Sequence, residues 1–411
     1  MPGPVLGDGQ RLTDNREHMN RQQRTIRYRI RILAGLAVAL IGFGLSGMRA
    51  HAAGTVAEAA AQETGAATAA QETSAEAAAQ ENKTAPVLDR FLIDHRVLLL
   101  PAGGKRRLSV KKWPPKVKSR TVGWTVSDEA VLQVSEDGTV TALTPGHARV
   151  EASLADGAFT DTCAVLVYPD GDLAAIAEEQ PNWTYKALYR AIASLQGKKS
   201  PWKRILCIGD SVTAGVQAGS GKLQWIPNYP LTMSEILGVK VYNRGVGGSS
   251  IWSGGSFTIK DSLDRFEPAD AVFVLGGYND WFYGEQCPIG DPDTPGTFTG
   301  DFNALCDRIT EVYPRADIFV IIPSTPHAHV GVEPYADFSW LSAIELEIAR
   351  AHGFHVIHLP SEDILNGLEE DTWRTFFSDN VHLNDYGYMA LGTIIADRAL
   401  VVLQEDGAAG R

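Results

Sequence analysis

Five short and continuous apolar runs lie in the second half of the chain, and stretches with the apolar spacing of helices separate them. Short apolar runs without alternation are typical of strands that are buried on both faces of a sheet. The runs are 204–208, 239–243, 271–276, 317–323 and 354–358, and the helical stretches are 231–237, 302–313, 340–352 and 386–403. Strands that alternate with helices predict a parallel sheet between two helical layers, so we expect a three-layer α/β/α domain over residues 181–405.

A different pattern precedes this domain, because residues 86–169 contain short apolar alternations that are separated by turn residues. Such alternation predicts strands with one buried face. The expected strands are 97–100, 107–110, 122–126, 131–134, 139–143, 148–152 and 163–167. Seven short strands in about 80 residues predict a small all-β sandwich. Asp137-Gly138 falls between two of the runs and predicts a hairpin turn.

The first 52 residues have the layout of an export signal. Seven Arg and three acidic residues precede the apolar run 32–48, and Ala50-His51-Ala52 follows as a small-x-small cleavage pattern. We expect cleavage after Ala52, and the alternative is an uncleaved membrane anchor. Residues 53–85 consist mainly of Ala, Glu, Gln and Thr and predict a linker. The folded domains are therefore expected to be secreted from a bacterial cell or held at its surface.

Charge and cysteine content narrow the class of protein. The chain has 37 Lys+Arg and 49 Asp+Glu, a formal net charge of -12, which argues against nucleic acid as the main partner. A basic cluster at 105–120 is either a solvated face or a contact for an anionic cell-wall polymer. The four cysteines form no CxxC pair, and the histidines show no metal-ligand spacing, so we expect no metal and no cofactor. In an exported protein, Cys287 and Cys306 either form a disulfide or remain free.

Polar sequences that contain glycine follow the first three predicted strands, at the edge of a parallel sheet where ligands bind, and a fourth polar sequence lies near the C-terminus. They are Gly-Asp-Ser at 209–211, Asn-Arg-Gly-Val-Gly-Gly-Ser at 243–249, Gly-Gly-Tyr-Asn-Asp at 276–280 and Ser-Asp-Asn-Val-His-Leu-Asn at 378–384. A serine at a tight turn between a strand and a helix exposes its hydroxyl, and its N–H lies where negative charge is favoured. Asp379 and His382 lie three residues apart, so the carboxylate can hold Nδ1–H while Nε2 faces a nucleophile.

Each of these sequences alone has a plainer interpretation. Gly, Asp and Ser are common turn residues, Gly248 fits a simple turn, and Asn279 and Asp379 fit helix caps. All four sequences occur at the ends of predicted elements of one domain, and this combination favours an enzyme over chance caps.

The four blocks resemble those of the SGNH, or GDSL, hydrolase superfamily, in family order and over some 200 residues. The resemblance implies a flavodoxin-like fold in which Ser211 is the nucleophile, His382 the base and Asp379 its carboxylate partner. It also implies an oxyanion hole made by the N–H of Ser211, the N–H of Gly248 and the side-chain amide of Asn279. The first block, IGDSVTAG, departs slightly from many members around its glycine.

Residues 123–152 resemble the bacterial immunoglobulin-like group 2 domain. The shared features are Trp124, Ser127-Asp128, Val131, Val134, Asp137-Gly138-Thr139-Val140 and Gly146 before Ala148-Arg149-Val150. The resemblance implies an immunoglobulin-like sandwich without chemistry of its own. The module is expected to hold the following domain away from the surface, and the alternative is that it binds cell-wall glycans.

The blocks together imply two-step hydrolysis of a carboxylic ester through an acyl-enzyme. We expect the substrate to contact residues within or beside the blocks, namely Asp210, Trp252, Tyr278 and Trp281. Export and the aromatic residues favour acetyl esters on a polysaccharide. Lipase, arylesterase or lysophospholipase activity is the alternative within the family. An O-acyltransferase and a non-catalytic glycan-binding adhesin are the alternatives outside it.

Overall fold

The computed structural model describes residues 91–114, 120–154, 159–218, 227–327 and 338–409. All of them belong to one compact unit that spans Thr84–Arg411. The predicted export signal at 1–52 and the linker at 53–85 lie outside the described residues.

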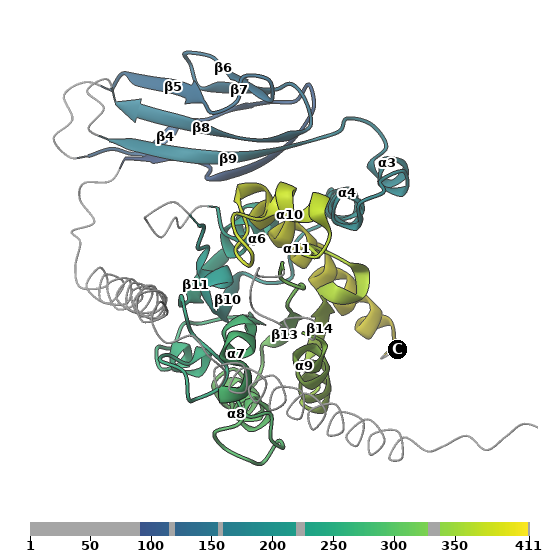
Figure 1. The fold of residues 1–411 in the computed structure, drawn as a ribbon. Helices are drawn as coiled ribbons and strands as arrows, with labels where there is room; N and C mark the ends of the chain where they lie inside the picture. Colours follow the sequence, from purple (N-terminus) through teal and green to yellow (C-terminus); the bar gives the residue numbers. More distant parts are fainter. Residues whose placement is uncertain (1–90, 115–119, 155–158, 219–226, 328–337, 410–411) are drawn as a thin grey trace, which may run out of the picture. The chain divides into compact units, whose positions relative to one another are not determined.

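The first described segment is a β-sandwich, as the apolar alternation predicts. One sheet has the strand order β2-β9-β8-β5 and the other the order β3-β7-β6, while β1 and β4 form a separate pair (Figure 1). The strands are β1 Leu92–Ile93, β2 Val97–Pro101, β3 Lys105–Arg107, β4 Val110–Lys112, β5 Val122–Val126, β6 Leu132–Val134, β7 Thr139–Ala142, β8 Gly146–Leu154 and β9 Thr160–Tyr168. The hairpin expected at Asp137-Gly138 joins β6 to β7, which pair antiparallel.

The single strand predicted at 107–110 is wrong, because the chain changes partners there. β3 pairs with β7, whereas β4 pairs with β1. Between them, the N–H of Leu108 donates to the carbonyl of Gly138, and the N–H of Ser109 donates to the Asp94 carboxylate. Leu108 is buried in the sandwich core and anchors the segment in which the chain changes partners.

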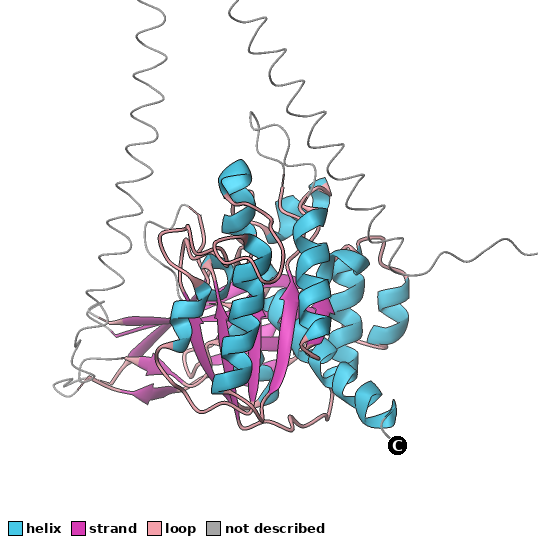
Figure 2. Ribbon diagram, turned by 90° about the horizontal axis from the view of Figure 1, so that it is seen from below, coloured by secondary structure: helices cyan, strands magenta, loops and turns pink. Residues whose placement is uncertain are grey.

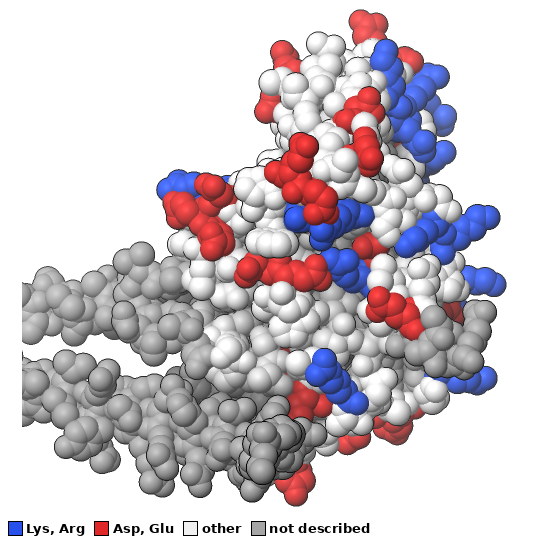
Figure 3. Space-filling model, turned by 90° about the vertical axis from the view of Figure 1, so that its right-hand side faces the viewer, with Lys and Arg blue, Asp and Glu red and all other residues white. Residues whose placement is uncertain are grey.

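Basic side chains dominate the short strands β3 and β4. Lys105, Arg106, Arg107, Lys111 and Lys112 are all exposed. Figure 3 shows Lys and Arg gathered along one side at the top of the view, whereas elsewhere on this face they alternate with Asp and Glu. The structure therefore places five of the charges of the predicted basic cluster on exposed strands.

The second domain is built on a five-stranded parallel sheet with the order β11-β10-β12-β13-β14. Its strands are β10 Arg204–Gly209, β11 Lys240–Gly245, β12 Ala271–Leu275, β13 Asp317–Ile322 and β14 His355–His358. Every predicted strand is present within two residues of its expected ends. From β10 the chain adds β11 on one side of the sheet and then β12, β13 and β14 on the other side. The carboxyl ends of the strands at this reversal form the edge where ligands bind in such sheets.

Helices cover both faces of the sheet (Figures 1 and 2). On one face, α11 (Asp385–Ala409) packs against α4 (Trp183–Leu195), α6 (Tyr229–Leu237) and α10 (Glu370–Phe376). On the other, α8 (Phe298–Val312) packs against α9 (Ser339–Ala351). The three-layer α/β/α fold predicted from the sequence is confirmed.

The helices α3 (Leu173–Glu178), α4 and α10 were not predicted, and neither were the 3-10 turns η1 (Ile259–Leu263), η2 (Gly284–Gln286) and η3 (Leu359–Glu362). The helices expected after the first and third strands are the short α5 (Ser211–Ala214) and α7 (Tyr278–Tyr283). The sequence does contain a start signal for α4, the asparagine at position 182. The Asn182 side chain accepts hydrogen bonds from the N–H groups of Thr184 and Tyr185, which is the usual role of Asn at an N-cap.

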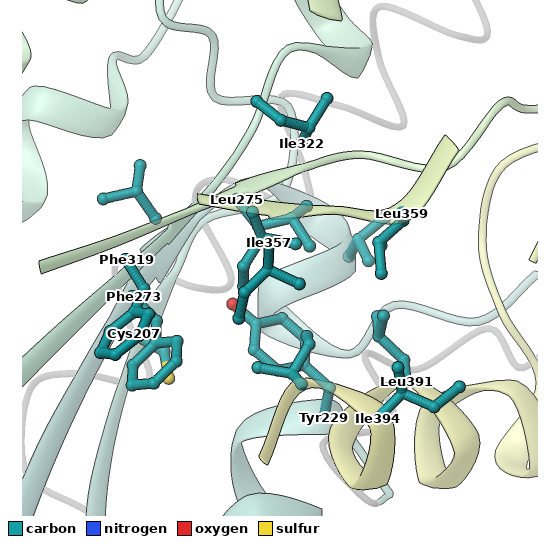
Figure 4. Close-up of a cluster of buried hydrophobic side chains, with 14 of the residues drawn as sticks. Cys207, Tyr229, Phe273, Leu275, Phe319, Ile322, Ile357, Leu359, Leu391 and Ile394 are labelled. Atoms are coloured by element: carbon teal, nitrogen blue, oxygen red, sulfur yellow. The ribbon is translucent and has the colours of Figure 1, made fainter. Parts of the chain in front are cut away.

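Large apolar side chains fill both spaces beside the sheet (Figure 4). Phe273 and Phe319 stack with ring centroids 4.6 Å apart, and Cys207 lies beside them. Cys287 and Cys306 are separate, buried free thiols, so the structure does not contain the disulfide that was one of the two expectations for this pair. Burial raises the pKa of the Cys287 thiol to about 12, which makes it an inert apolar residue.

The long helix α11 is apolar enough to resemble a membrane span. Among the described residues, its segment Asp385–Glu405 is the one stretch that passes this test by length and composition. Most of its apolar 18-residue window, 78%, is buried inside the protein, as expected for the core helix of a folded domain.

Candidate active site

Ser211 lies at the turn between β10 and α5, at the carboxyl edge of the sheet. The preceding residue, Asp210, is the N-cap of α5, and its carboxylate accepts a hydrogen bond from the N–H of Val212 at 2.9 Å. Ser211 is the first residue of the helix, where backbone N–H groups have no partner within the helix. The turn thus places the Ser211 hydroxyl on the same residue as a backbone N–H that has no partner within the helix.

His382 connects Ser211 to Asp379. Its Nε2 lies 2.8 Å from the Ser211 Oγ, and its Nδ1 lies 2.7 Å from an Asp379 carboxylate oxygen. A carboxylate only accepts, so Nδ1 carries a proton and Nε2 can accept the proton of the serine hydroxyl. The structure therefore brings together the three residues that the sequence predicts as the triad, in the hydrogen-bonding order that the prediction requires.

Asp379 is held within residues 378–384, which we call the His382 loop. Its second carboxylate oxygen accepts from the N–H groups of Val381 and His382 at 2.7 and 2.6 Å. Burial would raise the pKa of Asp379, but the hydrogen bond and charge of His382 and these two N–H groups outweigh it and lower the pKa. The carboxylate therefore stays ionised beside the imidazole.

The second block forms a loop against the nucleophile turn. The N–H of Val246 donates to the carbonyl of Gly209 at 3.0 Å, and the Ser249 hydroxyl donates to the same carbonyl at 3.1 Å. Gly248 has a φ of +78°, a left-handed conformation that glycine adopts without strain. This loop keeps Gly248 next to the strand end that carries Ser211.

Asn279 reaches this loop from the third block. Its side-chain amide donates to the carbonyl of Ser249 at 2.8 Å, next to Gly248. The N-cap of α7 is Gly277, without a side-chain cap, so the alternative of Asn279 as a helix cap is wrong. An amide nitrogen has two hydrogens, and the contact with Ser249 uses one of them.

Gly277 lets the third block turn sharply above buried side chains. Its φ is +108°, and a Cβ atom there would lie 2.8 Å from Leu341 and 3.0 Å from a carboxyl oxygen of Glu345. Asp280, next to Asn279, accepts hydrogen bonds from the N–H groups of Ile251 and Trp252. Asp280 thereby connects the third block to the segment that follows the second block.

The comparisons with known proteins agree with this geometry. Residues 207–390 match the model of the GDSL-like Lipase/Acylhydrolase family, and residues 89–165 match that of the Bacterial Ig-like domain (group 2). The second domain is a GDSL-type ester hydrolase. The sandwich is a bacterial Ig-like domain of group 2.

Solved structures with similar hydrolase domains include a lipase/acylhydrolase from Enterococcus faecalis, an acetyl xylan esterase and Est24, a carbohydrate acetylesterase from Sinorhizobium meliloti. Their sequence identities are 21%, 20% and 17%, and their TM-scores are 0.34, 0.35 and 0.36. Each covers 47–49% of this chain and 93–99% of its own. None of the curated proteins compared with the chain matches it.

Three of the four residues expected to touch the substrate are buried inside the hydrolase domain. Asp210 is fully buried, the Tyr278 hydroxyl donates to the carbonyl of Ser324 at 2.9 Å, and Trp281 packs against Phe338. Their burial argues against direct substrate contact, although one carboxylate oxygen of Asp210 has no hydrogen-bond partner among the described residues. Trp252 is partly exposed and remains a candidate, although its indole N–H donates to the carbonyl of Gly296.

Two residues that the sequence analysis did not assign to the site contact the His382 loop. The indole N–H of Trp373 donates to the carbonyl of Asp379, and the backbone N–H of His327 donates to that of Asn380. Their sequence positions carry no motif. Among the described residues, no group of three His, Cys, Asp or Glu side chains is arranged to hold a metal ion.

The buried carboxyl of Asp210 predicts an unusual pH dependence of stability. Burial raises its pKa to about 7, against the lowering effect of the Val212 N–H and His382. The folded protein thus binds this proton more tightly than the unfolded chain. As the pH rises from about 4 to 7, the free energy of unfolding should therefore fall, and this group contributes up to about 1.4 kcal/mol per pH unit.

The variant Asp210→Asn keeps an N-cap side chain and removes the titrating group, so its stability should fall less between pH 5 and 7 than that of the wild type. Urea unfolding at both pH values measures the difference. Asp172→Asn at the exposed N-cap of α3 is the matched control and should follow the wild type. A parallel fall in wild type and Asp210→Asn would contradict the assignment.

Proposed function

We propose that the hydrolase domain cleaves carboxylic esters with Ser211 as nucleophile, His382 as general base and Asp379 as its orienting carboxylate. The observation that carries this proposal is the chain of two hydrogen bonds, 2.8 Å from Ser211 Oγ to His382 Nε2 and 2.7 Å from His382 Nδ1 to Asp379. Nucleophile, base and orienting group in this order are the recognised arrangement for activation of a serine hydroxyl.

The reaction proceeds in two steps. His382 takes the Ser211 proton as Oγ attacks the ester carbonyl, and then gives it to the leaving alcohol as the acyl-enzyme forms. Water attacks the acyl-enzyme in the same way and releases the acid. The N–H groups of Ser211 and Gly248 and the remaining amide hydrogen of Asn279 stabilise the oxyanion in both steps.

We propose acetyl esters on a polysaccharide as the substrate class. Aromatic side chains lie after the second block and on α7, which carries part of the third block, with Phe257 42% and Phe282 43% exposed and Trp252 packed edge-on against Tyr283. Aromatic faces offer sugar rings a flat apolar surface. Exposed aromatic side chains of this kind suit a long sugar chain that carries small acyl groups.

The proposed setting is outside the cytoplasm. Bacterial Ig-like domains of group 2 are typical of extracellular bacterial proteins, and this chain carries one over residues 89–165. We propose that the sandwich (residues 86–169) supports the hydrolase domain (residues 181–405). An anionic cell-wall polymer that contacts the exposed strands β3 and β4 is its proposed partner.

A substrate panel tests the proposal. We expect the purified protein to hydrolyse p-nitrophenyl acetate at least about tenfold faster than the decanoate, and to release acetate from acetylated xylan or another acetylated glycan. The deacetylated glycan is the matched control. A preference for the decanoate would contradict the acetyl assignment, and activity on small acetates without release from any glycan would contradict the polysaccharide.

A further inference from the structure

We propose that Trp373 and His327 are positioning residues that set the place of Asp379 relative to Ser211. This inference rests on the proposed function, because it concerns the carboxylate of the same triad. Trp373 belongs to α10, and His327 belongs to the segment that leaves β13. Both therefore reach the His382 loop from outside.

The two residues hold consecutive peptide carbonyls of the loop. Trp373 Nε1–H donates to the carbonyl of Asp379 at 2.9 Å, and the backbone N–H of His327 donates to the carbonyl of Asn380 at 2.8 Å. The main chain that carries the Asp379 carboxylate is thus bonded to two separate elements of the domain.

The two side chains also hold each other. Their rings stack almost parallel, with centroids 4.1 Å apart and an interplanar angle of 9°. His327 Nδ1 lies 2.7 Å from the carbonyl of Gly367, which only accepts, so Nδ1 carries the hydrogen. A Cβ atom at Gly367 would lie 2.4 Å from the backbone nitrogen of His327, so only glycine permits this close approach. The stacked pair is therefore fixed by contacts among α10, the segment after β13 and the segment around Gly367.

External contacts of this kind are needed because of how the triad is built. The hydrogen bonds inside the His382 loop keep Asp379 on His382, but Ser211 belongs to a different segment, the turn after β10. Contacts from outside the loop must place the Asp379–His382 pair against the serine. Catalytic geometry tolerates displacements of only about 0.5 Å, so a loosened loop should slow the reaction.

The variant Trp373→Phe tests this role, because phenylalanine keeps an aromatic ring for His327 but has no N–H group. We expect kcat on p-nitrophenyl acetate to fall about tenfold while KM stays within about twofold. A displaced Asp379 stabilises the His382 imidazolium less, so the acid limb of the kcat/KM profile should also move to lower pH. The buried carboxyl of Asp210 also interacts with His382, and it is the same in every variant compared.

Trp202→Phe is the matched control. The Trp202 indole N–H also donates a hydrogen bond, to Asp317 at 2.7 Å, but at the opposite edge of the sheet, where β13 begins. Loss of that bond should lower the melting temperature without moving kcat or the acid limb. If Trp373→Phe behaves like Trp202→Phe, with lower stability and normal kinetics, the positioning role is overturned.

A second comparison tests whether the pair acts as one unit. His327→Ala removes the stacked ring and should also lower kcat, and the double variant should lose less than the product of the two single losses. Losses that multiply would overturn the joint action. Wild-type esterase activity that is absent, or that survives Ser211→Ala, would instead refute the proposed function itself, so the two failures are distinguishable.

Discussion

Replacing Ser211 by alanine should lower kcat for ester hydrolysis by roughly 10⁴- to 10⁶-fold. The nucleophile is lost while the fold is expected to remain, because the Ser211 side chain makes its hydrogen bond to His382 and the Asp210 cap of α5 does not depend on it. The measurement is the steady-state rate on p-nitrophenyl acetate together with the melting temperature.

Ser342→Ala is the matched control for this variant. Ser342 is a buried serine of α9, and its loss removes a hydroxyl from the same domain without touching the triad. It should keep normal turnover. A Ser211→Ala protein that is folded and retains more than about a tenth of the wild-type rate would show that another group carries the reaction.

The second large effect is expected at Asn279. If its amide donates to the oxyanion, the hydrogen bond is strongest when charge has built up on the carbonyl oxygen, so its loss raises the barrier more than it weakens binding. Asn279→Ala should lower kcat by roughly 100- to 1000-fold, about 2.7 to 4 kcal/mol, with little change in KM. Kinetics and thermal unfolding of the same preparation measure both quantities.

The structure gives Asn279 a second contact that the experiment must separate from the first. Its hydrogen bond to the carbonyl of Ser249 contributes about 1 kcal/mol to stability by the usual measure, so some fall in melting temperature is expected. Ser211 and His382 remain in Asn279→Ala, so a slow reaction that depends on the serine should persist. A lower melting temperature with normal kcat would restrict Asn279 to its structural contact.

The parallel sheet could be predicted closely from the sequence, because strands covered on both faces are short apolar runs with polar ends. The runs at 204–208 and 271–276 became β10 and β12 with shifts of one residue. The run at 107–110 misled, since alternation describes which side chains are buried and not which strand each half joins. Leu108 is buried where the chain passes from one pairing to another, and no local pattern records that change.

In the active site, too, some residues could be predicted from the sequence and others could not. Ser211, Asp379 and His382 could be singled out because their chemistry requires particular residue types in short motifs. The surroundings could not be predicted, since they depend on segments far apart in the chain. Asp210 and Tyr278 belong to the blocks but are buried inside the domain, whereas Trp373 and His327 carry no motif and yet donate hydrogen bonds to the His382 loop.

The account depends most directly on Ser211 as the group that attacks the ester. Treating the protein with a serine-directed alkyl phosphonate and locating the adduct by peptide mass spectrometry tests this claim in one measurement. We predict one adduct, on Ser211, formed in step with the loss of esterase activity and absent from Ser211→Ala. An adduct on another residue, or full loss of activity with Ser211 unmodified, would contradict the account.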